Sequence, residues 1–259
     1  MKYLWSHEGA LRQALKTHPR IFLFLDFDGT LAEIAPTPDS VTLPQTARKL
    51  LSALARKIKL AIITGRSISD LKKYFSLPAV IYSGSHGREF QWGKNRIIVK
   101  PSKAVMNSLS VVTTSLKQLR KKFPGMLLEH KPFGIAVHYR LVDPELRGEL
   151  KKACQAVWRS HLVRLEVVPG KMVYDVTSKT PAGTKGQAVA RLLRTRGGKG
   201  KVLPIYIGDD LSDETVFRVL RKMGGLTIHV GAQVRSTAEY YLKDPKDVLK
   251  WLRAVLRKY

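Results

Sequence analysis

Apolar residues follow two alternating patterns along the first hundred residues. Unbroken apolar runs at 21–25 and 60–63, and the segment AVIYSGSHG at 79–87, have the length and composition of strands that are buried on both faces of a sheet. Between them, apolar residues at spacings of three and four predict helices that begin at Pro44 and after Ser67. Strand and helix in strict alternation predict a parallel sheet with crossover helices.

The pattern changes in the middle of the chain. A helix is predicted from 103 to 123, followed by a hairpin in MLLEHKPFGIAVHYR at 126–140. A second helix follows, with Asp143 as its cap, and then a second hairpin, for which we predict a turn at Pro169 and Gly170. Helix plus hairpin, twice over, predicts a four-stranded antiparallel sheet with helices on one face.

The α/β pattern returns near the end of the chain. Thr184 opens a helix, VLPIYIGDD at 202–210 reads as a buried strand, and Ser212 is predicted to cap the next helix. A strand at 225–231 and an amphipathic helix at 246–259 complete the pattern, with Trp251 in the core.

These patterns predict two domains. The first is a doubly wound, mainly parallel α/β core, formed by residues 1–101 and 179–259. The second is a smaller α+β domain of residues 102–178, inserted into the first. No apolar run is long enough to cross a bilayer, and MKYLWSHEGA lacks the apolar region of a secretory signal. We expect a cytoplasmic monomer without membrane contacts, in which the lone Cys154 is a core residue.

The net charge of +26 is high for a chain of 259 residues. A positive field of this size attracts phosphorylated substrates, nucleic acids or anionic surfaces. The basic runs KQLRKKF, RLLRTRGGKGK and LKWLRAVLRKY could bind nucleic acid. We disfavour that reading because single-strand binders interleave aromatic residues with basic ones, whereas the first run has only Phe123 at its end, the second has none, and Trp251 of the last run is predicted to lie in the core.

Polar residues gather where three strands of the predicted core end. In an open α/β sheet, ligands bind beyond the carboxyl ends of the strands. The residues at these strand ends include several carboxylates, which repel one another unless a cation lies among them. Hard oxygen ligands of this kind favour Mg²⁺. The residues are Asp26, Asp28, Thr64, Asp209, Asp210 and Asp213, with Lys185 at a helix start that could face the same crevice.

This set suits the transfer of a phosphoryl group. Asp26 is a competent nucleophile that would form an aspartyl-phosphate. Asp28, two residues on, is close enough to protonate the leaving oxygen and later to take a proton from water. A lone Asp-x-Asp is a weak signal, and the set gains its value from all the motifs together.

DFDGT, TGR, KG at 185–186 and GDDLSDE resemble the four motifs of the haloacid dehalogenase superfamily of aspartate-nucleophile phosphatases. The inserted domain resembles the larger, C2-type cap of that superfamily. FLDFDGTLAEIAPTPDSVTLP, SGSHGREF, EHKPFGIAVHYR and GKMVYDV are similar to segments of trehalose-6-phosphate phosphatases. The resemblance implies a Rossmann-like core and Mg²⁺-dependent hydrolysis of trehalose 6-phosphate, a step of trehalose biosynthesis.

The resemblance also implies residue roles. Asp26 would be the nucleophile and a metal ligand, Asp28 the acid/base and a metal ligand through its carbonyl, and Asp209 the remaining ligand. Thr64 and Lys185 would hold the phosphoryl oxygens. The supporting residues would be Asp210 and Asp213. Substrate-binding residues would be His86, Arg88 and Glu89 in the core, and Glu129, Lys131, His138, Arg140, Lys171 and Asp175 in the cap.

Alternatives stay open for the substrate. DVTSKTP departs from the family pattern, because Asp175 replaces a Glu and either Thr177 or Lys179 stands in for a basic residue. Sucrose 6-phosphate or a glycosyl phosphoglycerate are therefore alternative substrates, and the charged cap residues could instead be cross-strand ion pairs. A phosphomutase is disfavoured, since the large cap suits one disaccharide. A polyanion-binding scaffold without catalysis is also disfavoured, since it would not need Asp28, Lys185 and Asp209 together.

Overall fold

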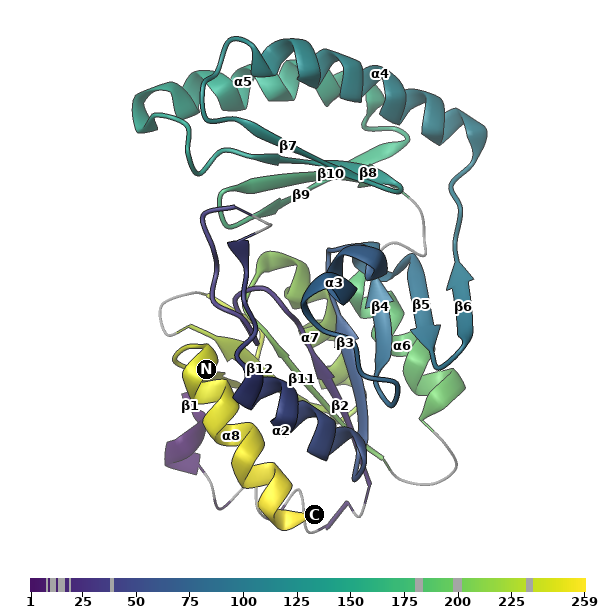
Figure 1. Cartoon of the computed structure of the whole chain (residues 1–259), viewed down its shortest axis with the longest axis vertical. Helices are drawn as coiled ribbons and strands as arrows, with labels where there is room; N and C mark the ends of the chain where they lie inside the picture. Colours follow the sequence, from purple (N-terminus) through teal and green to yellow (C-terminus); the bar gives the residue numbers. More distant parts are fainter. Residues whose placement is uncertain are drawn as a thin grey trace. The chain divides into compact units, whose positions relative to one another are not determined.

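The computed structural model describes residues 1–7, 9, 13, 17–18, 20–37, 40–179, 184–197, 202–231 and 235–259. The chain divides into two compact units (Figure 1). Unit 1 comprises Met1–Ile98 and Thr184–Tyr259, and unit 2 comprises Val99–Gly183. Unit 2 is therefore an insertion in the sequence of unit 1.

Unit 1 is built on a nine-stranded sheet with the order β1-β13-β12-β11-β2-β3-β4-β5-β6. Neighbours from β1 to β4 pair in parallel, and β5 and β6 pair antiparallel at one edge. This mainly parallel α/β architecture agrees with the predicted fold class. The strands are β1 Lys2–Tyr3, β2 Ile21–Leu25, β3 Lys59–Ile63, β4 Ile81–Gly84, β5 Glu89–Trp92, β6 Asn95–Ile98, β11 Leu203–Gly208, β12 Leu226–Val230 and β13 Tyr240–Leu242.

Helices cover both faces of this sheet. They are α2 Gln45–Ala55, α3 Ile68–Tyr74, α6 Lys185–Arg196, α7 Glu214–Lys222 and α8 Pro245–Lys258, with 3₁₀ turns η1 Leu4–His7, η3 Ser85–Gly87 and η6 Leu211–Asp213. Side chains of α2, α3 and α8 pack in one hydrophobic cluster, and those of α6 and α7 pack in another. These layers give the doubly wound arrangement.

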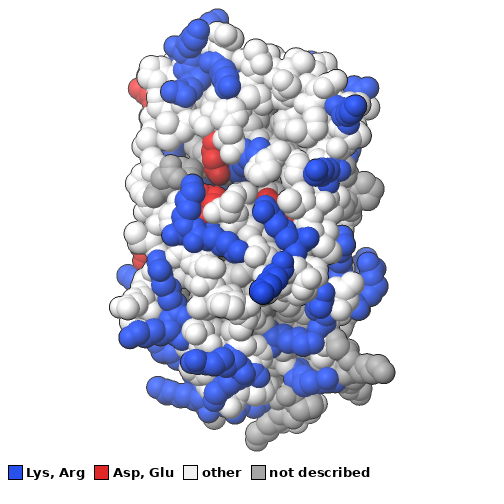
Figure 2. Space-filling view, turned by 45° about the vertical axis from the view of Figure 1, so that its right-hand side comes forward, with Lys and Arg blue, Asp and Glu red and all other residues white. Residues whose placement is uncertain are grey.

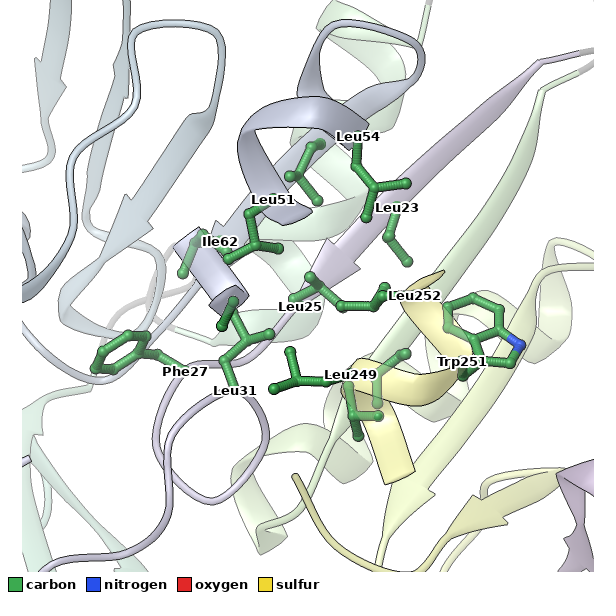
Figure 3. Close-up of a cluster of buried hydrophobic side chains, with 14 of the residues drawn as sticks. Leu23, Leu25, Phe27, Leu31, Leu51, Leu54, Ile62, Leu249, Trp251 and Leu252 are labelled. Atoms are coloured by element: carbon green, nitrogen blue, oxygen red, sulfur yellow. The ribbon is translucent and has the colours of Figure 1, made fainter. Parts of the chain in front are cut away.

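The central strand β2 explains the unbroken apolar run IFLFL. Its side chains alternate between the two faces of the sheet. Leu23 and Leu25 pack in the cluster that contains α2 and α8, whereas Phe22 and Phe24 pack in the cluster that contains α6 and α7. All five residues of β2 are buried, and each side chain of this size stabilises the fold by about 1.5–3 kcal/mol. Figure 3 shows the first cluster, with Leu51, Leu54, Leu249, Trp251 and Leu252 from the two helices.

Several helix starts carry the expected caps. The Ser67 hydroxyl accepts from the Asp70 amide at 3.1 Å, and Thr184 forms a full capping box with Gln187. The prediction that Ser212 caps a helix is wrong. Asp210, two residues earlier in the strand-to-helix connection, caps η6 instead, because its carboxylate accepts from the Leu211 amide at 2.7 Å.

Unit 2 has a four-stranded antiparallel sheet of order β7-β8-β10-β9. Its strands are β7 Leu127–Lys131, β8 Gly134–His138, β9 Leu165–Gly170 and β10 Val173–Ser178, and its helices are α4 Lys103–Arg120 and α5 Arg147–Trp158, with 3₁₀ turns η4 Pro144–Leu146 and η5 Arg159–His161. Side chains of both helices, including Cys154, share one hydrophobic cluster with Ile135, Val137 and Val176 of the sheet. The predicted core position of Cys154 is confirmed, and burial raises the pKa of its thiol to about 12.

The second hairpin of unit 2 turns later than predicted. Pro169 and Gly170 still pair with Tyr174 and Val173, so they belong to β9. The chain reverses at the next two residues, where Met172 adopts a φ of 67°. Pro and Gly therefore mark the strand end here and not the turn itself. Among the described residues, no helix is both long and apolar enough to span a membrane.

Candidate active site

The carboxyl end of β2 presents Asp26 in a buried position. Its side chain is 5% exposed, and its amide donates to the carbonyl of Ile207 on the neighbouring β11 at 2.9 Å. Lys185, the first residue of α6, reaches the same point from another part of the chain. Its Nζ lies 2.8 Å from Oδ1 of Asp26 and 2.7 Å from Oδ1 of Asp213. Residues 159 positions apart thus meet in one buried ion pair.

Asp213 accepts hydrogen bonds from four protein donors. Besides Lys185, it accepts from the Tyr206 hydroxyl at 2.5 Å and from the amides of Asp209 and Asp210 at 2.9 Å each. Both of its carboxylate oxygens are therefore engaged by protein donors, which suits a residue that orients others. Tyr206 was not among the predicted site residues, and its hydroxyl in an otherwise apolar strand was the available signal.

Asp26, Asp209 and Asp213 are buried, and each offers an oxygen within 4.8 Å of the others. Burial raises the pKa of Asp26 well above its ordinary value, Lys185 lowers it, and Asp213 and Asp209 raise it further. A divalent cation would offset this repulsion, and oxygen ligands are those that Mg²⁺ prefers. The carboxylate set fits such an ion.

The loop after β2 has to contain glycine at position 29. Gly29 has a φ of +76°, and a Cβ atom there would lie 2.1 Å from Oδ2 of Asp209. The chain can bring Asp209 this close to the DFDGT loop only because residue 29 lacks a side chain.

Asp28 is held by Arg66 of the TGR motif. The guanidinium donates from Nε to Oδ2 and from Nη2 to Oδ1 of Asp28, each at 2.7 Å, and from Nη1 to Asp70 at 2.8 Å. It also lies 5.0 Å from the ring centre of Tyr74. Although burial opposes its charge, the two carboxylates raise the pKa of Arg66 above its ordinary value. Arg66 was not among the predicted site residues.

Thr64 and the SGSHG segment lie side by side at the carboxyl ends of the adjacent strands β3 and β4. Thr64 is fully buried, and its hydroxyl accepts from the Arg66 amide at 3.1 Å. The His86 amide donates to the Thr64 carbonyl at 3.2 Å. His86 has a φ of +54°, and its ring lies so near Gly65 that a Cβ there would be 2.8 Å away. The two segments are thus packed directly on each other.

Arg88 and Glu89 follow this segment and are buried. Glu89 accepts from the Ser85 hydroxyl at 2.6 Å and from Nη2 of Arg96 at 3.2 Å. Glu89 is therefore hydrogen-bonded to the preceding turn η3 and to the neighbouring strand β6. Substrate binding by Arg88 and Glu89 stays a prediction.

In unit 2, the predicted substrate residues gather on one face of the sheet. Glu129 and Asp175 both pair with Ala136, so their side chains lie on the same face. This is the face opposite the helices, because the alternate residues, such as Val137 and Val176, pack in the helix cluster.

The charges on this face are paired across strands. Oε2 of Glu129 lies 2.8 Å from Nε2 of His138, and Lys131 forms an ion pair with Asp175. Burial opposes the charge of Glu129, but His138 and Lys131 lower the pKa of this carboxyl below its ordinary value.

The remaining predicted residues of unit 2 lie at the end of the same hairpins. Nη2 of Arg140 donates to the Lys171 carbonyl at 2.9 Å, which joins the two predicted residues by a backbone contact. In the altered segment DVTSKTP, the Thr177 hydroxyl donates to the Phe133 carbonyl at 3.3 Å and Lys179 donates to the Leu162 carbonyl at 3.4 Å. Thr180 and Pro181 of this segment lie outside the described residues.

Comparison with known proteins identifies the family. The family model described as trehalose-phosphatase matches residues 24–246. Trehalose-phosphate phosphatase B of Arabidopsis thaliana is 32% identical over 250 residues, which cover 92% of this chain and 66% of that protein. Probable trehalose-phosphate phosphatase 4 of Oryza sativa subsp. japonica is 31% identical, over 90% of this chain and 65% of that protein. The chain thus spans just under two thirds of these two relatives.

Solved structures give the same fold. The C-terminal domain of C. albicans trehalose-6-phosphate phosphatase superposes with a TM-score of 0.86 at 24% identity, covering 96% of each chain. A subclass IIB sugar phosphatase of the HAD (haloacid dehalogenase) superfamily superposes with a TM-score of 0.57 at 18% identity, covering 91% of this chain and 98% of that chain. The resemblance that the sequence motifs indicated is confirmed. The chain belongs to the trehalose-phosphatase family and has the haloacid dehalogenase fold.

Proposed function

We propose that this protein is a Mg²⁺-dependent phosphatase that hydrolyses trehalose 6-phosphate to trehalose and phosphate. One observation carries the proposal. A buried Asp26 at the end of β2 is paired with Lys185, which is itself fixed by Asp213, in a chain that the trehalose-phosphatase family model matches over 24–246. A carboxylate nucleophile beside a fixed cation is the arrangement that phosphoryl transfer needs.

In the first step, a carboxylate oxygen of Asp26 attacks phosphorus, and the bond between phosphorus and the sugar oxygen breaks. Asp28, acting here in its protonated form, gives its proton to the departing sugar oxygen and becomes a carboxylate, so trehalose leaves and an aspartyl-phosphate stays on Asp26. In the second step, Asp28 takes a proton from water as the water oxygen attacks phosphorus. Phosphate then leaves, and the carboxylate of Asp26 is restored.

Lys185 and Thr64 hold the phosphoryl oxygens in this proposal. Lys185 also favours the ionised form of Asp26, which burial alone would disfavour. The ion pair of Asp28 with Arg66 supports a role of Arg66 in positioning the acid/base.

Asp26, Asp209 and the backbone carbonyl of Asp28 would hold Mg²⁺. Asp213 is a poorer ligand candidate, because its oxygens already accept from protein donors. When bound, the ion would neutralise negative charge on the transferring phosphoryl group. Asp210 and Asp213 would be supporting residues.

Unit 2 is proposed to recognise the sugar through the polar face of its sheet. The carboxylates, ammonium group and imidazole on this face are half-buried and paired, so they are preorganised to accept from and donate to sugar hydroxyls. The proposed contacts are Glu129, Lys131, His138, Arg140, Lys171 and Asp175 in unit 2, and His86, Arg88 and Glu89 in unit 1.

The test is phosphate release by the purified protein, with and without Mg²⁺, from trehalose 6-phosphate, sucrose 6-phosphate, glucose 6-phosphate and a glycosyl phosphoglycerate. We expect a preference for trehalose 6-phosphate, loss of activity without Mg²⁺, and a loss of at least about 1000-fold in Asp26→Asn. Asp143→Asn, which alters an exposed carboxylate of unit 2, is the matched control and should keep its activity. Turnover by Asp26→Asn at the wild-type rate would refute the mechanism, and preference for another sugar phosphate would refute the substrate.

A further inference from the structure

A cavity of about 470 Å³ lies in unit 1 at the edge of the sheet where the strands begin. Ile21, Leu60 and Ile81, from the starts of β2, β3 and β4, contribute apolar side chains to its lining. The catalytic candidates follow the opposite ends of these strands. Since a five-residue strand is roughly 16 Å long, the cavity is separate from the site around Asp26.

The cavity is strongly basic. The cationic residues that line it are Arg20, Arg56, Lys57, Lys59 and Arg196. No Asp or Glu occurs among its described lining residues. Figure 2 shows the same imbalance more widely, with many Lys and Arg side chains and few carboxylates on the face in view.

The negative ends of helix dipoles neutralise only part of the positive charge at the cavity. The carboxyl ends of α2, α6 and α8 lie at the cavity, since Arg56, Gly197 and Tyr259 follow these helices and line it. Each end carries about half a negative charge, so three ends offset about one and a half positive charges. Lys59 donates to the carbonyl of Arg196 at the end of α6 and serves this purpose directly. The five cations exceed what the helix ends require.

Several donors at the cavity are available to a ligand. Arg56 and Lys57 are exposed and form no ion pair within the described ranges of the chain. Arg196 lies 4.1 Å from the ring centre of Trp92, which restrains its guanidinium beside the cavity. The hydroxyl of Tyr259, another lining residue, is buried and has no hydrogen-bond partner among the residues that the structure describes. Cations around a concave surface can bind several anionic groups at once.

We propose that this cavity binds a small anion that carries several phosphate groups. Its volume falls within the range of about 300–1,000 Å³ that is typical of small-molecule sites. Linked phosphates can contact the separated cations together, whereas a single phosphate reaches only some of them. The shared chemistry is a polyphosphate chain, either free or attached to a nucleoside whose base would lie on the apolar lining. The inference does not depend on the catalytic proposal.

The test is calorimetric titration of tripolyphosphate into three proteins. These are the wild type, the double variant Arg56→Gln/Lys57→Gln, and the control Lys151→Gln/Lys152→Gln, which removes two adjacent exposed cations from α5 of unit 2. Any binding at the Asp26 site is common to all three, so the differences report the cavity. We expect affinity about tenfold weaker in the Arg56/Lys57 variant and nearly unchanged in the control, because each lost cation removes one short-range attraction.

Three further titrants sharpen the result. Inorganic phosphate should bind more weakly than tripolyphosphate, and ATP should lose affinity in the same variant. If ATP binds more tightly than tripolyphosphate, the ligand is a nucleotide, and if not, it is the free polyphosphate chain. Absence of tripolyphosphate binding at physiological salt, or an equal loss in the control, would overturn the proposal. A single-stranded oligonucleotide that binds more tightly and is weakened by the same two changes would replace it with a nucleic-acid surface.

Discussion

At the scale of single residues, the site depends on how Asp213 is held. Its Oδ1 accepts from both Nζ of Lys185 and the Tyr206 hydroxyl, and all three groups are buried. A hydrogen bond to a buried charged group contributes about 1.5–3 kcal/mol. We therefore expect Tyr206 to be a positioning residue that acts on Asp26 through Asp213 and Lys185.

Tyr206→Phe should lower kcat about tenfold and leave KM nearly unchanged, because the buried phenol is expected to act only by fixing Lys185, which is proposed to hold the transferring phosphoryl group. Steady-state kinetics measure kcat and KM, and urea unfolding measures the free energy of unfolding. Tyr82→Phe is the matched control, because it removes a hydroxyl that bonds the backbone of Leu77 in the same unit. The control should lose stability at unchanged kcat. An equal kcat in Tyr206→Phe and the wild type would contradict the positioning role.

At the scale of elements, α6 brings Lys185 to Asp26, so the start of this helix is part of the proposed catalytic geometry. Thr184→Ala removes the side chain that accepts from the Gln187 amide at 3.2 Å. We expect a loss of about 1 kcal/mol in unfolding free energy and a several-fold lower kcat, because Lys185 follows the cap directly.

Asp244→Ala is the control for this change. It removes the cap of α8, where the carboxylate accepts from the Asp247 amide at 2.8 Å, and α8 carries none of the proposed catalytic residues. It should cost similar stability with kcat preserved. If both variants keep the wild-type kcat, the cap of α6 is structural only.

Elements with strong local signals could be predicted from sequence, and elements that depend on distant partners could not. β2 and β11 are continuous apolar runs, and their type was predicted correctly. β1 and β13 were missed, because each is only two or three residues long and exists through pairing with its neighbours. The same reason hid the contact of Arg66 with Asp28, since 38 residues separate the two and no local pattern joins them.

At the scale of the whole molecule, basic residues far outnumber acidic ones, so there are too few acids to pair with every cation. The buried site is the exception, because acidic residues are concentrated there. Several of the few acids in this chain are gathered at the carboxyl ends of β2 and β11, where Asp26, Asp209 and Asp213 lie together. Motifs predicted this gathering because the ends of parallel strands meet at one edge of a sheet. The cations around the opposite edge come from loops and helix ends that carry no motif. The sequence therefore indicated the net charge but not where these cations lie.

Gathered carboxylates make the stability of the metal-free protein sensitive to Mg²⁺. An ion that binds only the folded state stabilises it by mass action, by about 2.7 kcal/mol at one hundred times Kd. Mg²⁺ should therefore raise the melting temperature of the wild type by several degrees, but not that of Asp209→Asn. Without Mg²⁺, Asp209→Asn should melt above the wild type, because one of the three repelling charges is gone.

Thermal unfolding with and without Mg²⁺ measures both effects, and it does so without reference to turnover. Asp210→Asn is the matched control, since the neighbouring carboxylate caps η6 and lies outside the group of three. This variant should keep nearly the wild-type stability, because asparagine caps a turn about as well as aspartate, and it should keep the response to Mg²⁺. An Mg²⁺ response in Asp209→Asn as large as in the wild type would exclude Asp209 as a ligand. The ion would then bind elsewhere in unit 1, and the carboxylates at the end of β2 would need Lys185 alone to offset their charge.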